Sequence, residues 1–243
     1  MQKIGIFDSG VGGLTFYKEL KKVANVGVVY FGDNARAPYG SKSKEVLQSY
    51  AEEIMAFLEK KGCDTYVCAC NSLASNVVFD REVIELISYG AEDALEKTKT
   101  GKIGLLATEA TVKSGAFEKY IENLQSVTCP KFVPLIENGE TDIDDVAYEY
   151  VNKLNDVDTI ILGCTHYPLI KDTISKFTTA DLIDPAVKTA EIFKNVKQVT
   201  PCLDGNDEFY VSGDTLKFEA FFEKVFGYEI KAKQILDICP QIG

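Results

Sequence analysis

The sequence of 243 residues contains no tryptophan and a single histidine, His166. One histidine cannot build a metal site with several histidine ligands, and we expect no metal ion in this protein. The sequence also lacks an apolar run long enough to span a bilayer, and its first residues lack the layout of a signal peptide. We therefore expect a cytoplasmic protein that does not bind membranes.

Positive charge is scarce, because 26 lysine and arginine residues stand against 37 aspartate and glutamate residues, which gives a net charge of −11. A chain with this balance repels polyanions, so we expect no nucleic-acid partner. A small anionic ligand remains compatible with the sequence, because the field inside a binding site depends on the side chains around it.

The seven cysteines are an odd number, and most of them stand in apolar runs. In a cytoplasmic protein such residues are expected to be free thiols rather than a disulfide framework. The fractions of hydrophobic residues (46%) and charged residues (26%) are those of an ordinary globular protein. The length allows one large domain or two small ones.

Short apolar runs alternate with segments of helical spacing along the chain. This alternation predicts parallel β-sheets flanked by helices. We expect strands at residues 3–7, 26–31, 65–70, 102–106, 159–164 and 208–212. We expect helices at residues 14–23, 43–61, 114–124, 144–155, 169–177, 186–196 and 214–226.

Two parts of the sequence repeat a short pattern. Lys3-Ile4-Gly5 corresponds to Lys102-Ile103-Gly104, and Ser9 and Thr108 follow at the same distance from the two lysines. A repeat of this kind indicates two similar α/β halves, each with a parallel sheet and helices on both of its faces.

Two cysteines stand in matching positions. Cys70 and Cys164 each end an apolar run, and an aspartate, Asp64 or Asp158, stands six residues before each of them. Two strands would thus deliver two thiols to the carboxyl ends of their sheets, where the thiols can face one another across a small substrate. We interpret the other cysteines as small buried hydrophobic residues: Cys63, Cys68, Cys129, Cys202 and Cys239.

Polar residues follow nearly every apolar run, and ligands of parallel α/β sheets bind at the strand ends. These candidates are Asp8, Ser9, Asn71, Ser72, Thr108, Thr111, Glu137, Thr165 and His166. Helix capping and turn formation are a sufficient explanation for Ser9 or Thr111 alone. They do not explain why two cysteines also end long apolar runs.

The glycine-rich segment 8–13 lacks the Gly-Lys-Ser/Thr ending of a phosphate loop and the Gly-x-Gly-x-x-Gly pattern of a dinucleotide site. Nucleotide binding is therefore weakly supported. Its backbone N–H groups at the start of a helix suit a carboxylate.

Four segments, 5–14, 33–40, 133–137 and 162–169, resemble glutamate racemases of the aspartate/glutamate racemase family. The resemblance implies racemisation of glutamate by two bases without pyridoxal phosphate or another cofactor, to supply D-glutamate for peptidoglycan synthesis. It implies these catalytic residues: Cys70, Cys164, Asp8, Glu137 and His166. It implies these substrate contacts: Asp8, Ser9, Tyr39, Gly40, Asn71, Ser72, Thr108, Thr111, Thr165 and His166.

From this resemblance we expect two α/β domains with the active site in the cleft between them, and a homodimer. The first domain takes residues 1–97 and 208–243, and the second takes residues 98–207. The substrate is a small molecule, L- or D-glutamate.

The chemistry requires two acid/base groups on opposite faces of Cα, one to remove a proton and one to return it. The working base is a thiolate, and a free cysteine has a pKa of about 8.5, so the site must assist deprotonation. Asp8 is expected to serve the Cys70 side, and His166, with Glu137, the Cys164 side.

Alternatives remain open. The usual Cys-Asn-Thr-Ala-Ser of the family is replaced here by the segment 70–75, Cys-Asn-Ser-Leu-Ala-Ser. A racemase of aspartate or another acidic amino acid is one alternative, and a racemase-like binding protein without catalysis is another. A thiol-redox or zinc protein is disfavoured by the single histidine and by the cysteine spacing. Arg36 suits either a carboxylate clamp or a solvated loop, and we assign it no role.

Overall fold

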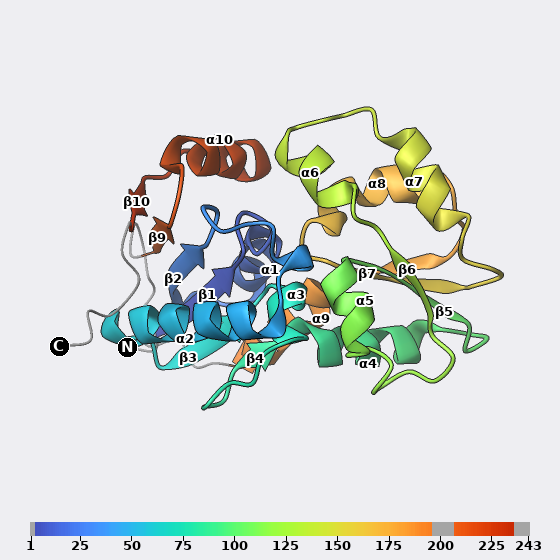
Figure 1. Cartoon of the computed structure of the whole chain (residues 1–243), viewed down its shortest axis with the longest axis horizontal. Coiled ribbons are helices and arrows are strands. Elements are labelled where there is room, and N and C mark those ends of the chain that lie inside the picture. Colours follow the sequence, from blue (N-terminus) through green and yellow to red (C-terminus); the bar gives the residue numbers. More distant parts are fainter. Residues whose placement is uncertain (1–2, 196–206, 236–243) are drawn as a thin grey trace.

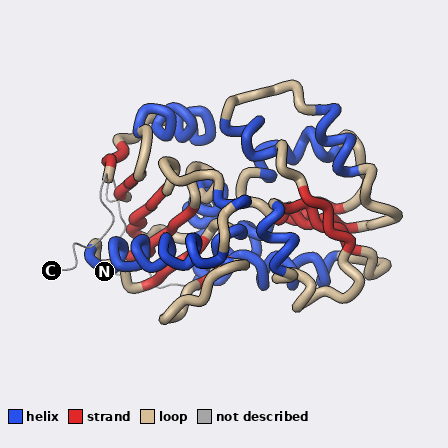
Figure 2. The backbone as a smooth tube through the Cα atoms, in the orientation of Figure 1, coloured by secondary structure: helices blue, strands red, loops and turns tan. Residues whose placement is uncertain are grey.

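The computed structural model describes residues 3–195 and 207–235 (Figure 1). Cys202, Cys239 and Val196, the last residue of one expected helix, lie outside the described residues. The strands form two separate groups, one in each half of the molecule (Figure 2).

The first sheet is parallel throughout and has the strand order β10-β9-β2-β1-β3-β4. Its strands are β1 (Lys3–Asp8), β2 (Gly27–Gly32), β3 (Thr65–Cys68), β4 (Ile84–Glu85), β9 (Glu208–Val211) and β10 (Ala232–Gln234). The second sheet is also parallel and has the order β6-β5-β7-β8. Its strands are β5 (Ile103–Ala107), β6 (Gln125–Thr128), β7 (Thr159–Gly163) and β8 (Asp181–Ile183).

Helices connect the strands, as parallel pairing requires. The α-helices are α1 (Leu14–Val23), α2 (Lys44–Lys60), α3 (Asn71–Ala74), α4 (Leu86–Lys97), α5 (Glu109–Ser114), α6 (Phe132–Glu137), α7 (Asp144–Val151), α8 (Lys171–Ser175), α9 (Pro185–Glu191) and α10 (Thr215–Phe226). The 3₁₀ helices are η1 (Tyr39–Ser41), η2 (Tyr167–Ile170) and η3 (Ile192–Asn195). None of the helices in the described ranges has the length and apolar character needed to cross a membrane.

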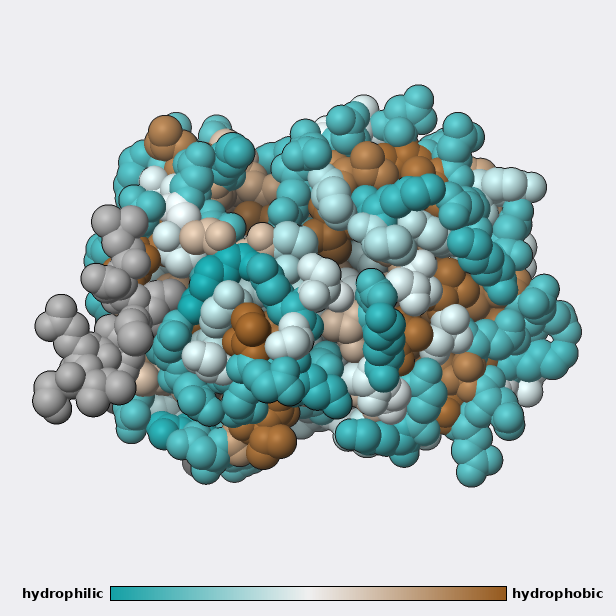
Figure 3. Space-filling view, viewed as in Figure 1, coloured by the Kyte–Doolittle hydropathy of each residue, from teal (hydrophilic) through white to brown (hydrophobic). Residues whose placement is uncertain are grey.

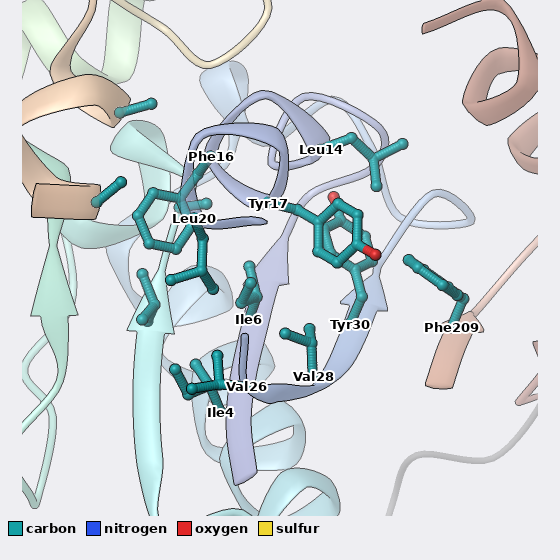
Figure 4. Close-up of a cluster of buried hydrophobic side chains, with 14 of the residues drawn as sticks. Ile4, Ile6, Leu14, Phe16, Tyr17, Leu20, Val26, Val28, Tyr30 and Phe209 are labelled. Atoms are coloured by element: carbon teal, nitrogen blue, oxygen red, sulfur yellow. The ribbon is translucent and has the colours of Figure 1, made fainter. Parts of the chain in front are cut away.

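Side chains of β1 alternate between two cores. Ile4 and Ile6 pack with α1, α9 and α10 on one face of the sheet, as the close-up in Figure 4 shows for α1. Phe7 packs on the other face, with α2. This period of two is the consequence of the strand pleat, and it leaves both faces of the first sheet covered by helices.

The second sheet is covered on both faces in the same way. Leu106 and Leu162 pack with α6, α7 and η2, while Leu105 and Ile161 pack with α4 and the segment after α5. Hydrophilic residues cover most of the face of the molecule in Figure 3. The prediction of an α/β fold with two similar parallel sheets and helices on both faces is confirmed.

Helix α9 belongs to the chain segment of the second sheet but packs against α1 and α4. Gly90 of α4 permits this contact, because a Cβ atom there would lie 2.7 Å from Cγ of Pro185. The contact joins the two halves on the side of α4 and α9.

Two expectations from the sequence are wrong. The helix expected at 114–124 is instead α5, which begins after the N-cap Thr108 and ends at Ser114, because the positive φ of 64° at Gly115 stops the helix. Glu137 does not follow a strand, because the run before it forms helix α6 and Glu137 is its last residue. Helix α4 and the strands β4, β6 and β10 are elements that the apolar pattern did not predict.

Candidate functional site

A cavity of about 120 Å³ lies where the strand ends of the two sheets meet. Helices α3, α5 and η1 contact one another at this junction (Figure 1). Most of the expected site residues line the cavity: Ser9, Tyr39, Gly40, Cys70, Asn71, Ser72, Thr108, Glu137, Cys164, Thr165 and His166. Asp8 and Thr111 are fully buried and lie behind the lining, in contact with Thr165 and Thr108.

The cavity has further lining residues that the sequence did not indicate: Ala37, Pro38, Ser41, Glu109, Cys129, Pro130, Val133 and Pro134. They come from the loop before η1 and the end of η1, from the start of α5, and from the segment after β6 together with helix α6. Cys129 is buried, and its thiol lies 3.4 Å from the carbonyl of Val127. The Ala-Pro and Cys-Pro pairs were available as turn signals, but a turn signal does not say which cavity a turn will border.

Cys70 lies between the end of β3 and the start of α3, and it is buried. Burial raises the pKa of the Cys70 thiol to about 12, with a further contribution from the negative charge of Asp8. The backbone N–H of Leu73 and the hydroxyl of Ser9 favour the thiolate and partly oppose this shift. The Cys70 thiol thus carries its proton at neutral pH.

Asp8 ends β1 and is fully buried. One carboxylate oxygen accepts the N–H of Gly10 at 2.9 Å, and the other accepts the hydroxyl of Thr165 at 3.2 Å. Burial raises the pKa of Asp8, while the charge of His166 and these hydrogen bonds act in the opposite direction. The carboxylate therefore joins the first sheet to the segment that follows β7.

Cys164 follows β7 and lies beside the chain's single histidine. Nδ1 of His166 is 3.8 Å from Sγ of Cys164, and Nε2 is 2.9 Å from a carboxylate oxygen of Glu137. Burial alone would lower the pKa of His166, but its contacts with Cys164 and Glu137 outweigh burial and raise that pKa to about 10. The imidazole thus connects a thiol to a carboxylate that is 36% exposed.

Hydroxyl groups from both halves meet on one wall. The Ser72 hydroxyl is 2.8 Å from that of Thr108, which is 3.1 Å from that of Thr111. Beside them, Oδ1 of Asn71 is buried and, among the described residues, has no hydrogen-bond partner. A buried acceptor of this kind is costly unless a ligand supplies a donor.

A roof over the cavity is formed by Tyr39 and Gly40 of η1. The Tyr39 hydroxyl donates to Asp33, which also accepts from Ser212 at 2.6 Å and from Arg36 at 2.6 Å. Burial and the charge of Asp33 raise the pKa of Tyr39, so the phenol remains a donor. Gly40 lies against the second half, because a Cβ atom there would be 3.2 Å from Cβ of Thr108.

Arg36 is neither a clamp in the cavity nor a solvated loop residue. It pairs with Asp33 and Glu53, and its guanidinium lies 3.9 Å from the centre of the Tyr50 ring. No lysine or arginine lines the cavity among the described residues, so the donors available there to an anionic ligand are hydroxyl, amide and backbone N–H groups and the imidazole of His166. Within the same residues, no group of three histidine, cysteine, aspartate or glutamate side chains is arranged to hold a metal ion.

Comparisons with known proteins show which family the chain resembles. A family model described as Asp/Glu/Hydantoin racemase matches residues 4–192. A glutamate racemase from Aquifex aeolicus (strain VF5) is 39% identical, over 95% of this chain and 96% of that protein. The structure of a glutamate racemase isoform from Bacillus anthracis is 32% identical with a TM-score of 0.87, over 96% of this chain and 97% of that one. A glutamate racemase from Francisella tularensis subsp. tularensis SCHU S4, solved with D-glutamate, gives 31% identity and a TM-score of 0.85 over 98% of both chains.

Proposed function

Because the chain belongs to the aspartate/glutamate/hydantoin racemase family, we propose that it interconverts L- and D-glutamate by proton transfer at Cα. The observation that carries this proposal is the pair of thiols, Cys70 and Cys164, which come from two different sheets and line one small cavity. Among the described residues, the lining includes no lysine, the residue with which pyridoxal phosphate forms an imine. In this proposal the two thiols act as the acid and the base.

In one direction, the thiolate of one cysteine removes the Cα proton and becomes a thiol. The thiol of the other cysteine gives its proton to the opposite face of the same carbon and becomes a thiolate. Each turnover thus exchanges the protonation states of Cys70 and Cys164, and the reverse reaction restores them. The raised pKa of Cys70 supports a resting state in which this residue is the acid.

Asp8, His166 and Glu137 assist these transfers. His166, at 3.8 Å from the Cys164 sulfur, takes or returns the thiol proton, and Glu137 stabilises the imidazolium that results. Asp8 is the titratable neighbour of Cys70, and its raised pKa makes proton exchange accessible nearer to neutral pH.

Hydroxyl, amide and backbone donors bind the substrate. Glutamate carries two carboxylates and one ammonium group, and Oδ1 of Asn71 is a buried acceptor that suits the ammonium. Hydroxyl and backbone N–H groups suit the carboxylates and the charge that develops at Cα. The residues proposed for binding are Asp8, Ser9, Tyr39, Gly40, Asn71, Ser72, Thr108, Thr111, Thr165 and His166.

We assign the product, D-glutamate, to peptidoglycan synthesis, and we place the protein in the cytoplasm as a homodimer that binds neither nucleic acid nor membranes. We divide the chain into a first domain of residues 1–97 with 208–243 and a second domain of residues 98–207. Residues 196–206 and 236–243 lie outside the described part of the chain. Size-exclusion chromatography with light scattering tests the dimer, which a monomeric mass would contradict.

The deciding experiment is the decay of circular dichroism when the purified protein is given L- or D-glutamate. We expect the signal to fall to zero from both enantiomers, with a known glutamate racemase as the positive control. Parallel assays with L- and D-aspartate test the alternative substrate, and faster turnover of aspartate would overturn the assignment to glutamate. Absence of turnover with both substrates would leave a racemase-like binding protein.

A further inference from the structure

Thr15 lies in the first turn of α1, on the first sheet's side of the junction, and is buried. Its hydroxyl is 2.9 Å from the carbonyl of Gly12 and 3.1 Å from the carbonyl of Thr165. Thr165 stands between Cys164 and His166 in the sequence. The Thr15 hydroxyl therefore links the first half directly to the segment 164–166 of the second half through a hydrogen bond.

Gly12 packs directly against Thr165 and His166, with no room for a side chain. A Cβ atom at Gly12 would lie 2.3 Å from Oγ1 of Thr165 and 2.5 Å from Nδ1 of His166. Nδ1 is the atom that faces the Cys164 sulfur at 3.8 Å. The backbone of Gly12 is outside the left-handed region, so this contact, rather than the backbone angle, is what excludes a side chain.

Thr165 is thus held at two points by one segment of the first half. Its hydroxyl donates to Asp8, and its carbonyl accepts from Thr15. Two bonds to one residue fix both its position and the orientation of its peptide plane. The same residue precedes His166, so this orientation determines where the imidazole enters the cavity.

We propose that Thr15 is a positioning residue. Together with Gly12, which has no side chain, it fixes the position of Cys164 and His166 relative to Cys70 across the junction of the two sheets. This inference rests on the proposed racemisation. A displacement of about 1 Å in a catalytic group costs up to about 10²-fold in rate. Thr15 is not among the residues that line the cavity, so we expect its main effect to be on kcat rather than on binding.

The test uses Thr15→Val, which keeps the shape of the side chain and removes the hydroxyl. We expect kcat to fall at least tenfold while KM changes less than threefold, and Thr15→Ser to recover most of the lost rate. Thr189→Val is the matched control, because the Thr189 hydroxyl is also buried but bonds to the carbonyl of Pro185 within its own helix, at 2.7 Å. Racemisation in Thr15→Val at the rate of Thr189→Val would overturn the proposal.

A second readout uses the fact that His166 is the chain's single histidine, so one imidazole signal titrates in the NMR spectrum. In Thr15→Val we expect its pKa to fall from about 10 toward the ordinary value of about 6.5 by at least one pH unit. In Thr189→Val it should not move. An unchanged titration in Thr15→Val would contradict a positioning role.

Gly12→Ala is the second variant, and it decides the matter if Thr15→Val does not fold. It keeps the Thr15 hydroxyl but introduces a methyl group against Nδ1 of His166. We expect the same loss of kcat and the same fall in the histidine pKa, and wild-type behaviour of a folded Gly12→Ala would overturn the proposal. A wild-type protein that does not racemise glutamate would refute the proposed function, whereas the NMR titrations would still test the positioning.

Discussion

In the proposed reaction, the two cysteine sides of the cavity perform the same chemical task with different neighbours. Cys70 has a buried carboxylate, Asp8, on its side, and burial with this charge raises the pKa of its thiol to about 12. Cys164 has an imidazole 3.8 Å away, and that imidazole contacts Glu137. The proposed reaction, whose two directions are mirror images, would thus use unlike groups on its two sides, because only their ability to exchange a proton has to match.

Loss of either thiol is expected to have the largest effect. Cys70→Ser and Cys164→Ser should each reduce kcat with both enantiomers by about 10³-fold or more, because one face of Cα loses its acid/base group. Cys63→Ala is the control, since this buried cysteine packs behind the first sheet and away from the cavity. Circular dichroism with L- and D-glutamate measures the rates. Appreciable racemisation by either serine variant would show that the cysteine it lacks is not required as an acid/base group.

Asp8→Asn tests the Cys70 side, with an expected loss of kcat of about 10²-fold. Removal of the neighbouring negative charge should also lower the pKa of Cys70 from about 12. The pH dependence of alkylation, followed at the peptide containing Cys70 by mass spectrometry, measures this change. Asp64→Asn is the matched control, because Asp64 is an exposed aspartate directly before β3, at the end of that strand away from Cys70. An unchanged Cys70 titration would show that burial alone sets this side apart.

Glu137→Gln tests the Cys164 side, with an expected loss of kcat of about tenfold, because the imidazolium loses its partner. The folded pKa of His166, about 10, lies above the unfolded value of about 6.5. Its contribution to stability is therefore complete below pH 6.5 and is lost as the pH rises through 10.

Glu137→Gln should also lower the free energy of unfolding, by about 1–2 kcal/mol at pH 6 and by much less at pH 10.5. The expected loss is kept this small because the Glu137 side chain is partly exposed and solvent weakens its ion pair. Urea unfolding at the two pH values measures this difference. Glu140→Gln, a change at an exposed residue shortly after the end of α6, is the control. An equal loss at both pH values would show that the ion pair is not the cause.

Tyr39→Phe is expected to have the smallest effect. It should leave the surroundings of Cys70 and of Cys164 unchanged. It removes the hydrogen bond to Asp33 that fixes the roof, which is worth about 1 kcal/mol and corresponds to about a fivefold rise in KM with little change in kcat. Tyr120→Phe, at a half-exposed tyrosine, is the control. A change in kcat with only one enantiomer would show that the roof assists proton transfer on one side of the cavity.

Much of the fold followed from local pattern, because buried parallel strands are apolar runs and the helices between them are amphipathic. Both cysteines and most of the polar residues expected at strand ends line the cavity, because parallel strands bring their carboxyl ends to one edge. Glu137 was assigned to a strand end because a short apolar run is compatible with a strand or a buried helix, and it formed α6.

Contacts between distant segments could not be read from the sequence. Nothing in the local pattern around Thr15 indicates a bond to Thr165, and nothing around Asp33 indicates that Ser212 will donate to it. Cys129 was interpreted as a small buried hydrophobic residue, and it is buried, but it also borders the cavity. Whether a buried side chain borders a cavity depends on packing between elements, which periodicity does not record.

The pairing of β2 with β9 has a consequence for the order of assembly during synthesis on the ribosome. The four strands of the second sheet, between residues 103 and 183, are all translated before β9. The edge of β2 that pairs with β9 therefore remains unpaired until the last strands are synthesised. The hydrogen bond from Ser212 to Asp33 likewise forms only after a further 179 residues have been translated. The nascent chain thus carries both thiols well before the enclosure around them is finished.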